Sequence, residues 1–248
     1  MLLLRSIIFQ LYFYATGSVF AAGVALCSVF PHQVRFSVAR GWGKTMLWGG
    51  RVICGFRYSV EGEENIPDEA SIVMIKHTTV FETYAQLVFF PAQTWVVKRE
   101  LLWIPIFGWG LAAMSAIGID RGSGHRAVTQ VIEQGKERLA RGIWLTIYPE
   151  GTRMPPGQTR KYGISGAALA KEAGVKIVPV AHNAGDLWAR RGLRKRPGLI
   201  RFCIGPPIDA STQSPKETNL KVQAWVESKM AEISAGYKLK QDAAPADV

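Results

Sequence analysis

Acidic residues are absent from the N-terminal part of this 248-residue chain, because no Asp or Glu precedes Glu61. Between Ser6 and Val34 there is no Lys or Arg either. This uncharged run is long enough to cross the hydrocarbon core of a bilayer, which takes about 20 apolar residues. It predicts a membrane-embedded helical segment, either one span or, with a break at Gly17 and Gly23, a re-entrant pair of helices.

A cleaved signal peptide is the competing explanation of the same run. Only one early charge, Arg5, precedes the run, and no small-x-small cleavage site ends it. Both features favour an anchor over a signal peptide.

Basic residues follow the uncharged run before the first acid appears. They are Arg35, Arg40, Lys44, Arg51 and Arg57. The positive-inside bias then predicts that the following domain faces the cytoplasm, on the cytoplasmic (inner) membrane. Residues 36–56 mix these bases with Trp42 and Trp48, and they form either an interfacial amphipathic helix or an ordinary helix that faces the core.

Cysteine is scarce, and its three occurrences, Cys27, Cys54 and Cys203, are far apart. They form no CxxC pair and no metal-ligand spacing, so we expect reduced thiols and no metal centre. The chain also lacks the Gly-x-Ser-x-Gly motif of a serine hydrolase, since Gly163-Ile164-Ser165-Gly166 is one residue short of that spacing. The net charge of +11 suits an anionic partner. No nucleic-acid-binding motif accompanies the charge, so we expect membrane lipids and no nucleic acid.

Beyond a polar turn at residues 61–68, apolar strand-like runs alternate with helical patterns. The predicted strands cover residues 71–75, 94–97, 143–148, 175–180 and 199–204, and the predicted helices cover residues 84–90, 127–141, 166–173 and 219–233. This alternation predicts an α/β domain with a mixed sheet flanked by helices. We expect a membrane anchor and interfacial helix over residues 1–60, the globular domain over 61–238 and a disordered tail over 239–248.

The stretch from Lys76 to Thr83 joins a buried strand to a helix. His77 falls where the strand ends, the usual place of a reactive group on an α/β scaffold. Glu82 follows five residues later, so the two side chains meet only if His77 lies in the loop and Glu82 in the first helical turn. A carboxylate there fixes the tautomer of the imidazole and favours its protonated form during catalysis. The alternative is a structural His77 and a solvated Glu82.

Three further stretches end strands or precede helices. They are Gly118-Ile119-Asp120-Arg121, Tyr148-Pro149-Glu150-Gly151-Thr152-Arg153 and Val178-Pro179-Val180. Arg121 and Arg153 each offer a fork of donors to a phosphate. The turn at Glu150-Gly151-Thr152 offers backbone N–H groups to a developing anion. Taken singly, each stretch has an ordinary structural explanation.

In this order the four blocks resemble those of the glycerolipid acyltransferases that make phosphatidic acid, the 1-acyl-glycerol-3-phosphate acyltransferases. The blocks of that family are His-x4-Asp, a block ending in Asp-Arg, Phe-Pro-Glu-Gly-Thr-Arg-Ser and a Val-Pro strand. The resemblance spans about residues 60 to 205 and extends to the hydrophobic N-terminus. This chain departs from the pattern at Glu82, which adds a methylene but keeps the charge, and at Met154, where Ser is common.

The resemblance implies that His77 is a general base, which takes the proton of the 2-hydroxyl of lysophosphatidic acid as that oxygen attacks an acyl thioester. It implies that Glu82 orients His77 and stabilises its imidazolium. The implied substrate-binding residues are Arg121, Glu150, Gly151, Thr152, Arg153 and Pro179. The two arginines would hold the phosphate of the acceptor. The implied donor is acyl-CoA or acyl carrier protein, and no cofactor or metal is required.

Several features leave alternatives open. Residues 101–111 crowd aromatic side chains between Gly and Pro, and they dock on a bilayer, line an acyl groove or form a core loop. The basic residues 186–201 hold lipid headgroups or an acidic carrier protein, or form a solvated loop. We interpret His125 and His182 as non-catalytic. The rival functions are acyl transfer to another lysolipid, such as a lyso-ornithine lipid, and membrane-docked lipid binding without catalysis.

Overall fold

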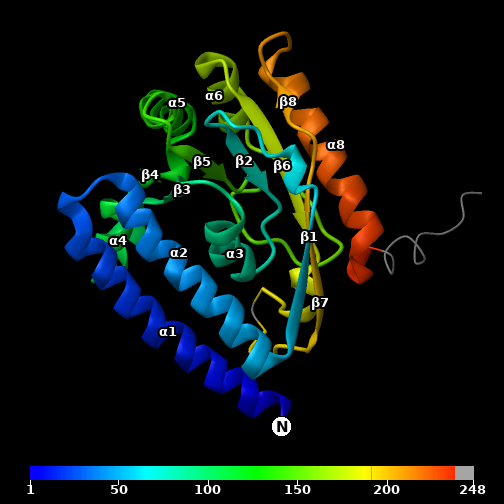
Figure 1. The fold of residues 1–248 in the computed structure, drawn as a ribbon. Helices are drawn as coiled ribbons and strands as arrows, with labels where there is room; N and C mark the ends of the chain where they lie inside the picture. Colours follow the sequence, from blue (N-terminus) through cyan, green and yellow to red (C-terminus); the bar gives the residue numbers. More distant parts are fainter. Residues whose placement is uncertain (191, 238–248) are drawn as a thin grey trace, which may run out of the picture.

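The computed structural model describes residues 1–190 and 192–237, apart from the side chain of Arg121. The tail expected to be disordered, residues 239–248, lies outside the described residues. The N-terminal part is a helical hairpin of α1 (Leu2–Leu26), a short turn η1 (Cys27–Val29) and α2 (His32–Gly49). Figure 1 shows the two long helices side by side along one flank of the molecule.

The hairpin turns at a proline and not at the glycines. Helix α1 runs unbroken through Gly17 and Gly23, so the alternative with a break at these glycines is wrong. A Cβ on Gly17 would lie 3.6 Å from Trp42 of α2, which places this glycine on the face that packs against α2. The chain reverses before Pro31, because a residue before proline is pushed into the extended conformation that Phe30 adopts.

Helix α2 faces the core, the second of the two alternatives left open for it. Its buried residues include Phe36, Gly43 and Met46. A Cβ on Gly43 would lie only 2.8 Å from the backbone oxygen of Tyr84, so α2 and α3 (Phe81–Phe89) touch closely at this point. A five-residue π-helical turn, η2 (Gly50–Cys54), then leads into the sheet.

The sheet is mixed, as predicted. Its strands are β1 (Phe56–Glu61), β2 (Ile72–Ile75), β3 (Gln93–Lys98), β4 (Ile117–Ile119), β5 (Trp144–Ile147), β6 (Lys176–His182), β7 (Gly198–Ile204) and β8 (Ile208–Asp209). Their order is β1-β7-β6-β2-β5-β3-β4, with β8 paired to β6. Only the pairs β6–β7 and β6–β8 are antiparallel among the described strands. The boundary expected at residue 61 falls at the end of β1, so the sheet begins inside the segment expected to be the anchor.

Helices cover both faces of the sheet. Besides α3 they are α4 (Phe107–Ala113), α5 (His125–Ala140), α6 (Ser165–Ala173), α7 (Ala184–Leu187) and α8 (Pro215–Ile233), with short 3₁₀ turns η3 (Glu63–Asn65), η4 (Arg99–Trp103) and η5 (Arg121–Ser123). Figure 1 shows α3 and the hairpin on one face and α5, α6 and α8 on the other. Strand β2 divides its side chains accordingly, because Val73 and Ile75 join the core under the hairpin while Ile72 and Met74 join the core under α5, α6 and α8.

Candidate active site

Three parallel strands end at one edge of the sheet and bring the predicted blocks together. Strand β2 runs parallel to β5 and to β6, so their carboxyl ends meet. Strand β2 leads to His77, β5 leads to Tyr148 and Glu150, and β6 ends at His182. The loop after β5 returns to the same place, since Met154 N donates to His77 O at 2.7 Å. This edge is where ligands usually bind in α/β sheets.

His77 and Glu82 form the pair that their spacing suggested. His77 lies in the loop and Glu82 lies in the first turn of α3, with 2.7 Å between His77 Nδ1 and Glu82 Oε1. A carboxylate only accepts, so this hydrogen bond places the ring proton on Nδ1. His77 Nε2 is then left as an unprotonated base.

Glu82 is a buried carboxylate with several donors around it. Its side chain is 0% exposed, and its Oε1 accepts from Thr78 N and Thr79 N, each at 3.0 Å. The Thr79 hydroxyl accepts from the N–H of Phe81, the first residue of α3, at 2.8 Å. Burial by itself raises the pKa of Glu82. The neighbouring His182 and His77 and the backbone donors lower it by more than burial raises it, so the pKa lies below its ordinary value. Glu82 is therefore ionised beside His77.

Tyr148 covers one face of the His77 ring. The two ring centroids are 4.2 Å apart, and the planes are inclined by 23°. Gln86 Nε2 donates to the Tyr148 hydroxyl at 2.7 Å and fixes the phenol in place. The stacked ring restricts rotation of the imidazole.

An apolar groove opens beside His77, between the hairpin, α3 and α4. Its lining includes Phe13, Gly17, Trp42, Leu87, Leu111 and Met114. His77 and Arg153 line the same groove. The groove therefore combines an apolar wall for a hydrocarbon chain with a base and a cation.

The aromatic stretch 101–111 contributes to the groove and to the surface. Leu101, Ile104 and Phe107 line the groove. Trp103 and Trp109 are 66% and 60% exposed. The stretch therefore lines the groove, and its two exposed tryptophans leave docking on a bilayer as a prediction.

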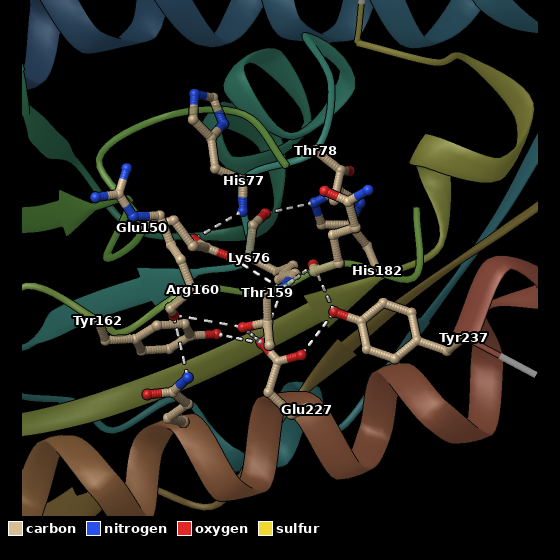
Figure 2. A network of polar contacts seen from close by, with 12 residues as sticks. Lys76, His77, Thr78, Glu150, Thr159, Arg160, Tyr162, His182, Glu227 and Tyr237 are labelled. Carbon is tan, nitrogen blue, oxygen red and sulfur yellow. Dashed lines mark hydrogen bonds and ion pairs between the residues drawn. The ribbon is translucent and has the colours of Figure 1, made fainter. Parts of the chain in front are cut away.

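Glu150 lies beneath the His77 backbone. Its Oε2 accepts from His77 N at 3.3 Å, and its Oε1 lies 3.1 Å from Lys76 Nζ. Figure 2 shows the His77 ring pointing away from this network. Burial raises the pKa of Glu150 to about 7, although Lys76 opposes the shift. We therefore assign Glu150 to the support of His77 and not to the substrate pocket.

Lys76 ties this edge of the sheet to the C-terminal helix. Its ammonium is fully buried, and Nζ donates to Glu227 Oε1 at 2.8 Å and to Gln158 O at 3.1 Å. Glu227 on α8 also accepts from the hydroxyls of Tyr162 and Tyr237, at 3.0 and 2.6 Å. A buried cation is tolerated only with such partners, so Glu227 offsets part of the cost of burying Lys76.

The loop after β5 places the other predicted residues of its block. Gly151 adopts a φ of +67°, a left-handed conformation that glycine accepts without strain. The Thr152 hydroxyl accepts from Arg190 Nη2 at 3.1 Å. Arg153 lines the groove with His77. Of this block, Arg153 is thus the residue best placed to meet a substrate anion.

Two further predicted substrate-binding residues are not seen in the groove lining. Pro179 is buried in β6, where it pairs with Met74, so we assign it to the scaffold and not to the pocket. The Arg121 side chain lies outside the described part of the structure. Its neighbour Asp120 accepts from Gly122 N at 2.9 Å and starts the turn η5.

Four residues of this site were given no role in it by the sequence analysis: Lys76, Tyr148, His182 and Glu227. Lys76 and Tyr148 lie within or beside the motifs, so their adjacency was a usable signal. His182 ends a strand at the same edge. Glu227 stands 151 residues from Lys76, and no sequence pattern pointed to it.

Comparisons with known proteins agree with this arrangement. A family model described as Acyltransferase matches residues 57–183. The 1-acyl-sn-glycerol-3-phosphate acyltransferase of Pseudomonas aeruginosa is 40% identical over 236 residues, which cover 93% of this chain and 92% of that protein. The human 1-acyl-sn-glycerol-3-phosphate acyltransferase alpha is 25% identical over 84% of this chain and 75% of its own length.

A solved structure has the same fold. The crystal structure of the 1-acyl-sn-glycerophosphate (LPA) acyltransferase PlsC from Thermotoga maritima superposes with a TM-score of 0.77, covering 94% of this chain and 97% of that chain at 24% identity. The extent of the family match and the bacterial relative together show that this chain belongs to the acyltransferase family. The resemblance inferred from the four blocks is thereby confirmed.

Replacing Glu82 tests the pair directly. Glu82→Gln keeps the size of the side chain and removes its charge, so we expect the rate of acyl transfer to fall about 10²- to 10⁴-fold. Glu82→Asp draws the carboxylate back from Nδ1 and should also lose activity. The measurement is thiol release from an acyl thioester, with the exposed Glu133→Gln as control. Wild-type rates in Glu82→Gln would refute the role of the carboxylate.

The pKa of Glu150 predicts a pH-dependent stability. A pKa of about 7 in the fold, against 4.5 for an ordinary Glu, means that the folded protein keeps a proton that the unfolded chain has lost. Stability should therefore decline as the pH rises from about 4.5 to 7, by up to roughly 3 kcal/mol. Glu150→Gln lacks this pH-dependent part of the stability. Its melting temperature should therefore rise relative to that of the wild type as the pH goes from 5 to 8. For the exposed Glu63→Gln we expect a melting-temperature difference from the wild type that does not change with pH. The same constant difference in Glu150→Gln would contradict the raised pKa of Glu150.

Proposed function

We propose that this protein transfers an acyl chain from an acyl thioester to the sn-2 hydroxyl of 1-acyl-glycerol-3-phosphate, giving phosphatidic acid in phospholipid synthesis. The observation that carries the proposal is the placement of His77. Its Nδ1 is held by the buried Glu82, and its ring lies in the wall of an apolar groove that also contains Arg153. The names of the bacterial and human relatives support the same acceptor.

The chemistry follows from the tautomer of His77. Its bare Nε2 takes the proton of the acceptor hydroxyl while the oxygen forms a bond to the thioester carbonyl carbon. The resulting tetrahedral intermediate expels the thiolate, and the imidazolium returns the proton to that sulfur. Glu82 stabilises the imidazolium between the two proton transfers, and the stacked Tyr148 ring restricts rotation of the imidazole. The acceptor alcohol attacks directly, so no acyl-enzyme forms.

The apolar part of the groove and its cation suit different parts of the substrates. The apolar lining from α1, α3 and α4 suits a hydrocarbon chain, and Arg153 suits the phosphate of the acceptor as a planar donor fork. We assign Arg121 to the same phosphate on the basis of its motif. We predict that no cofactor or metal takes part in this reaction.

The acyl donor in this proposal is acyl-CoA or acyl carrier protein. Arg190 reaches the loop after β5 through Thr152, and Arg194 and Arg196 are exposed nearby in the chain. These cations suit the phosphates of coenzyme A and the acidic surface of a carrier protein alike. The charges alone do not choose between the two acyl donors, so the activity measurement below compares them.

Helix α1 suits attachment to a membrane. The segment Leu2–Val29 is long and apolar enough to cross a bilayer by length and composition, with a mean hydropathy of 1.5. Only 11% of its most apolar window is buried in the fold. Because α2 packs on α3, the hairpin stays against the catalytic domain. We infer that α1, with the exposed Trp103 and Trp109, lies in one leaflet of the inner membrane while the domain faces the cytoplasm.

Thiol release in membranes tests the reaction. Wild-type protein should release thiol from palmitoyl-CoA only when 1-acyl-glycerol-3-phosphate is added, and His77→Ala should lose this release by about 10²- to 10⁴-fold. His125→Ala, an exposed histidine at the start of α5, serves as the control. Parallel reactions with palmitoyl-acyl carrier protein and with a lyso-ornithine lipid identify another donor or acceptor. Acceptor-dependent release that persists in His77→Ala would rule out the mechanism.

Proteolysis tests the orientation. Trypsin added to intact spheroplasts should leave the basic segment around Arg194 uncut, because the segment faces the cytoplasm. After lysis the same segment should be cut, since Arg194 is exposed. Cleavage in intact spheroplasts would place the domain on the outer side.

A further inference from the structure

The peptide bond between Lys76 and His77 lies just beyond the end of the sheet. Strand β2 ends at Ile75, so the hydrogen bonds of the sheet no longer hold both polar groups of this peptide. Two side chains hold them instead. His182 Nε2 lies 2.9 Å from Lys76 O, and His77 N donates to Glu150 Oε2 at 3.3 Å. Figure 2 shows His182 and Glu150 on opposite sides of this peptide.

These two contacts fix the orientation of one rigid plane. The carbonyl of Lys76 and the N–H of His77 belong to the same planar peptide unit. Holding its oxygen from one side and its nitrogen from the other prevents the plane from turning about the chain. The Cα of His77 is attached to that plane, so the direction in which the imidazole leaves the backbone depends on it.

The tautomer of His182 follows from its contacts. Ala184 N donates to His182 Nδ1 at 3.4 Å, so Nδ1 is unprotonated and the ring proton is on Nε2. Burial lowers the pKa of His182, and the opposing effect of Glu82 does not reverse this, so the ring stays neutral. A neutral ring in this tautomer offers its single N–H donor to Lys76 O.

The same nitrogen also faces the carboxylate that holds the base. His182 Nε2 lies 3.5 Å from Glu82 Oε2, while His77 binds the other oxygen, Oε1. His182 thus contacts both the backbone that carries His77 and the carboxylate behind it. Glu150, by contrast, makes its contact with the backbone N–H of His77.

The His182 ring is itself held rigidly. It is 0% exposed and stacks on Phe202 of β7, with ring centroids 6.0 Å apart and planes inclined by 10°. Phe81 of α3 lies against it at 6.5 Å between centroids. The donor is therefore already in place before substrate binds.

We propose that His182 is a positioning residue, whose Nε2–H clamps the Lys76–His77 peptide and supports Glu82 so that His77 faces the groove. This inference rests on the proposed role of His77 as general base. His182 takes no proton from substrate, which agrees with its interpretation as non-catalytic. The clamp adds a residue from β6 to a pair that otherwise comes from the loop after β2 and from α3.

Two substitutions separate the donor from the ring. His182→Leu fills much of the same space without an N–H, whereas His182→Gln can present its amide N–H near the position of Nε2. Hydrogen exchange of the amides of residues 77–79, measured by mass spectrometry, reports the clamp without any substrate. Turnover of palmitoyl-CoA with 1-acyl-glycerol-3-phosphate reports its effect on the reaction.

In His182→Leu we expect exchange of the His77 amide to become about tenfold faster. We expect kcat to fall about 10- to 100-fold with each KM within about twofold, because the base is misplaced while the groove is unchanged. His182→Gln should recover most of both losses. Val226→Ala, a buried residue of α8 in the opposite core, is the matched control for lost stability and should leave exchange at His77 unchanged.

Other results would overturn the inference. Wild-type exchange and wild-type kcat in His182→Leu would show that no clamp operates. Equal losses in His182→Leu and His182→Gln would show that only packing of the ring matters. Absence of turnover in the wild-type protein would count against the proposed function, and the exchange rates alone would then decide for or against the clamp.

Discussion

The buried carboxylate of Glu82 is the constraint on which this edge of the sheet depends. An ion without partners in a protein interior costs several kcal/mol, so Glu82 can lie there only because donors surround it. Thr78 N, Thr79 N and His77 Nδ1 supply them, and His182 approaches from the far side. The first three donors belong to consecutive residues of one loop, so the carboxylate ties that loop and the His77 ring to the first turn of α3.

A second charged group lies on the other side of the same loop. Lys76 and His77 are adjacent, and their side chains point in different directions, one into the protein and one toward the groove. Lys76 is balanced by Glu150 and Glu227, which joins the C-terminal helix to the strand that carries the base. The reactive ring thus lines the groove, while Lys76, Glu82 and Glu150 are buried behind it. This separation lets an apolar groove for an acyl chain lie directly beside a polar site.

The sequence was sufficient for the parts of the molecule that depend on local pattern. Strands β2, β5, β6 and β7 and helices α5, α6 and α8 were predicted from their periodicity, and Gly174 ends α6 in the left-handed conformation expected of a C-terminal glycine. The His77–Glu82 pair was also accessible, because both residues lie within one strand–helix junction. Helix α4 and strand β1 were missed, since neither carries a strong periodic signal of its own.

Three features of the structure did not follow from the sequence patterns. The α1–α2 hairpin turns at Pro31, a position that apolar composition alone did not distinguish from Gly17 or Gly23. The motif that contains Glu150 suggested a substrate contact, but its carboxylate turns inward because Lys76 lies beneath it. Pro179 matched a motif and proved to be buried in β6. For Glu150 and Pro179 the outcome depended on contacts with Lys76 and Met74, which are distant in the sequence.

The most direct test of this account is the protonation state of the His77 ring. The chain has four histidines, so the ring nitrogens of protein labelled with ¹⁵N-histidine can be resolved by NMR and assigned with a His77→Gln variant. The account predicts a hydrogen on Nδ1 and a bare Nε2 at pH 8, because Glu82 accepts from Nδ1. A hydrogen on Nε2 with a bare Nδ1 would contradict it, since His77 would then have no free nitrogen on the side of the groove.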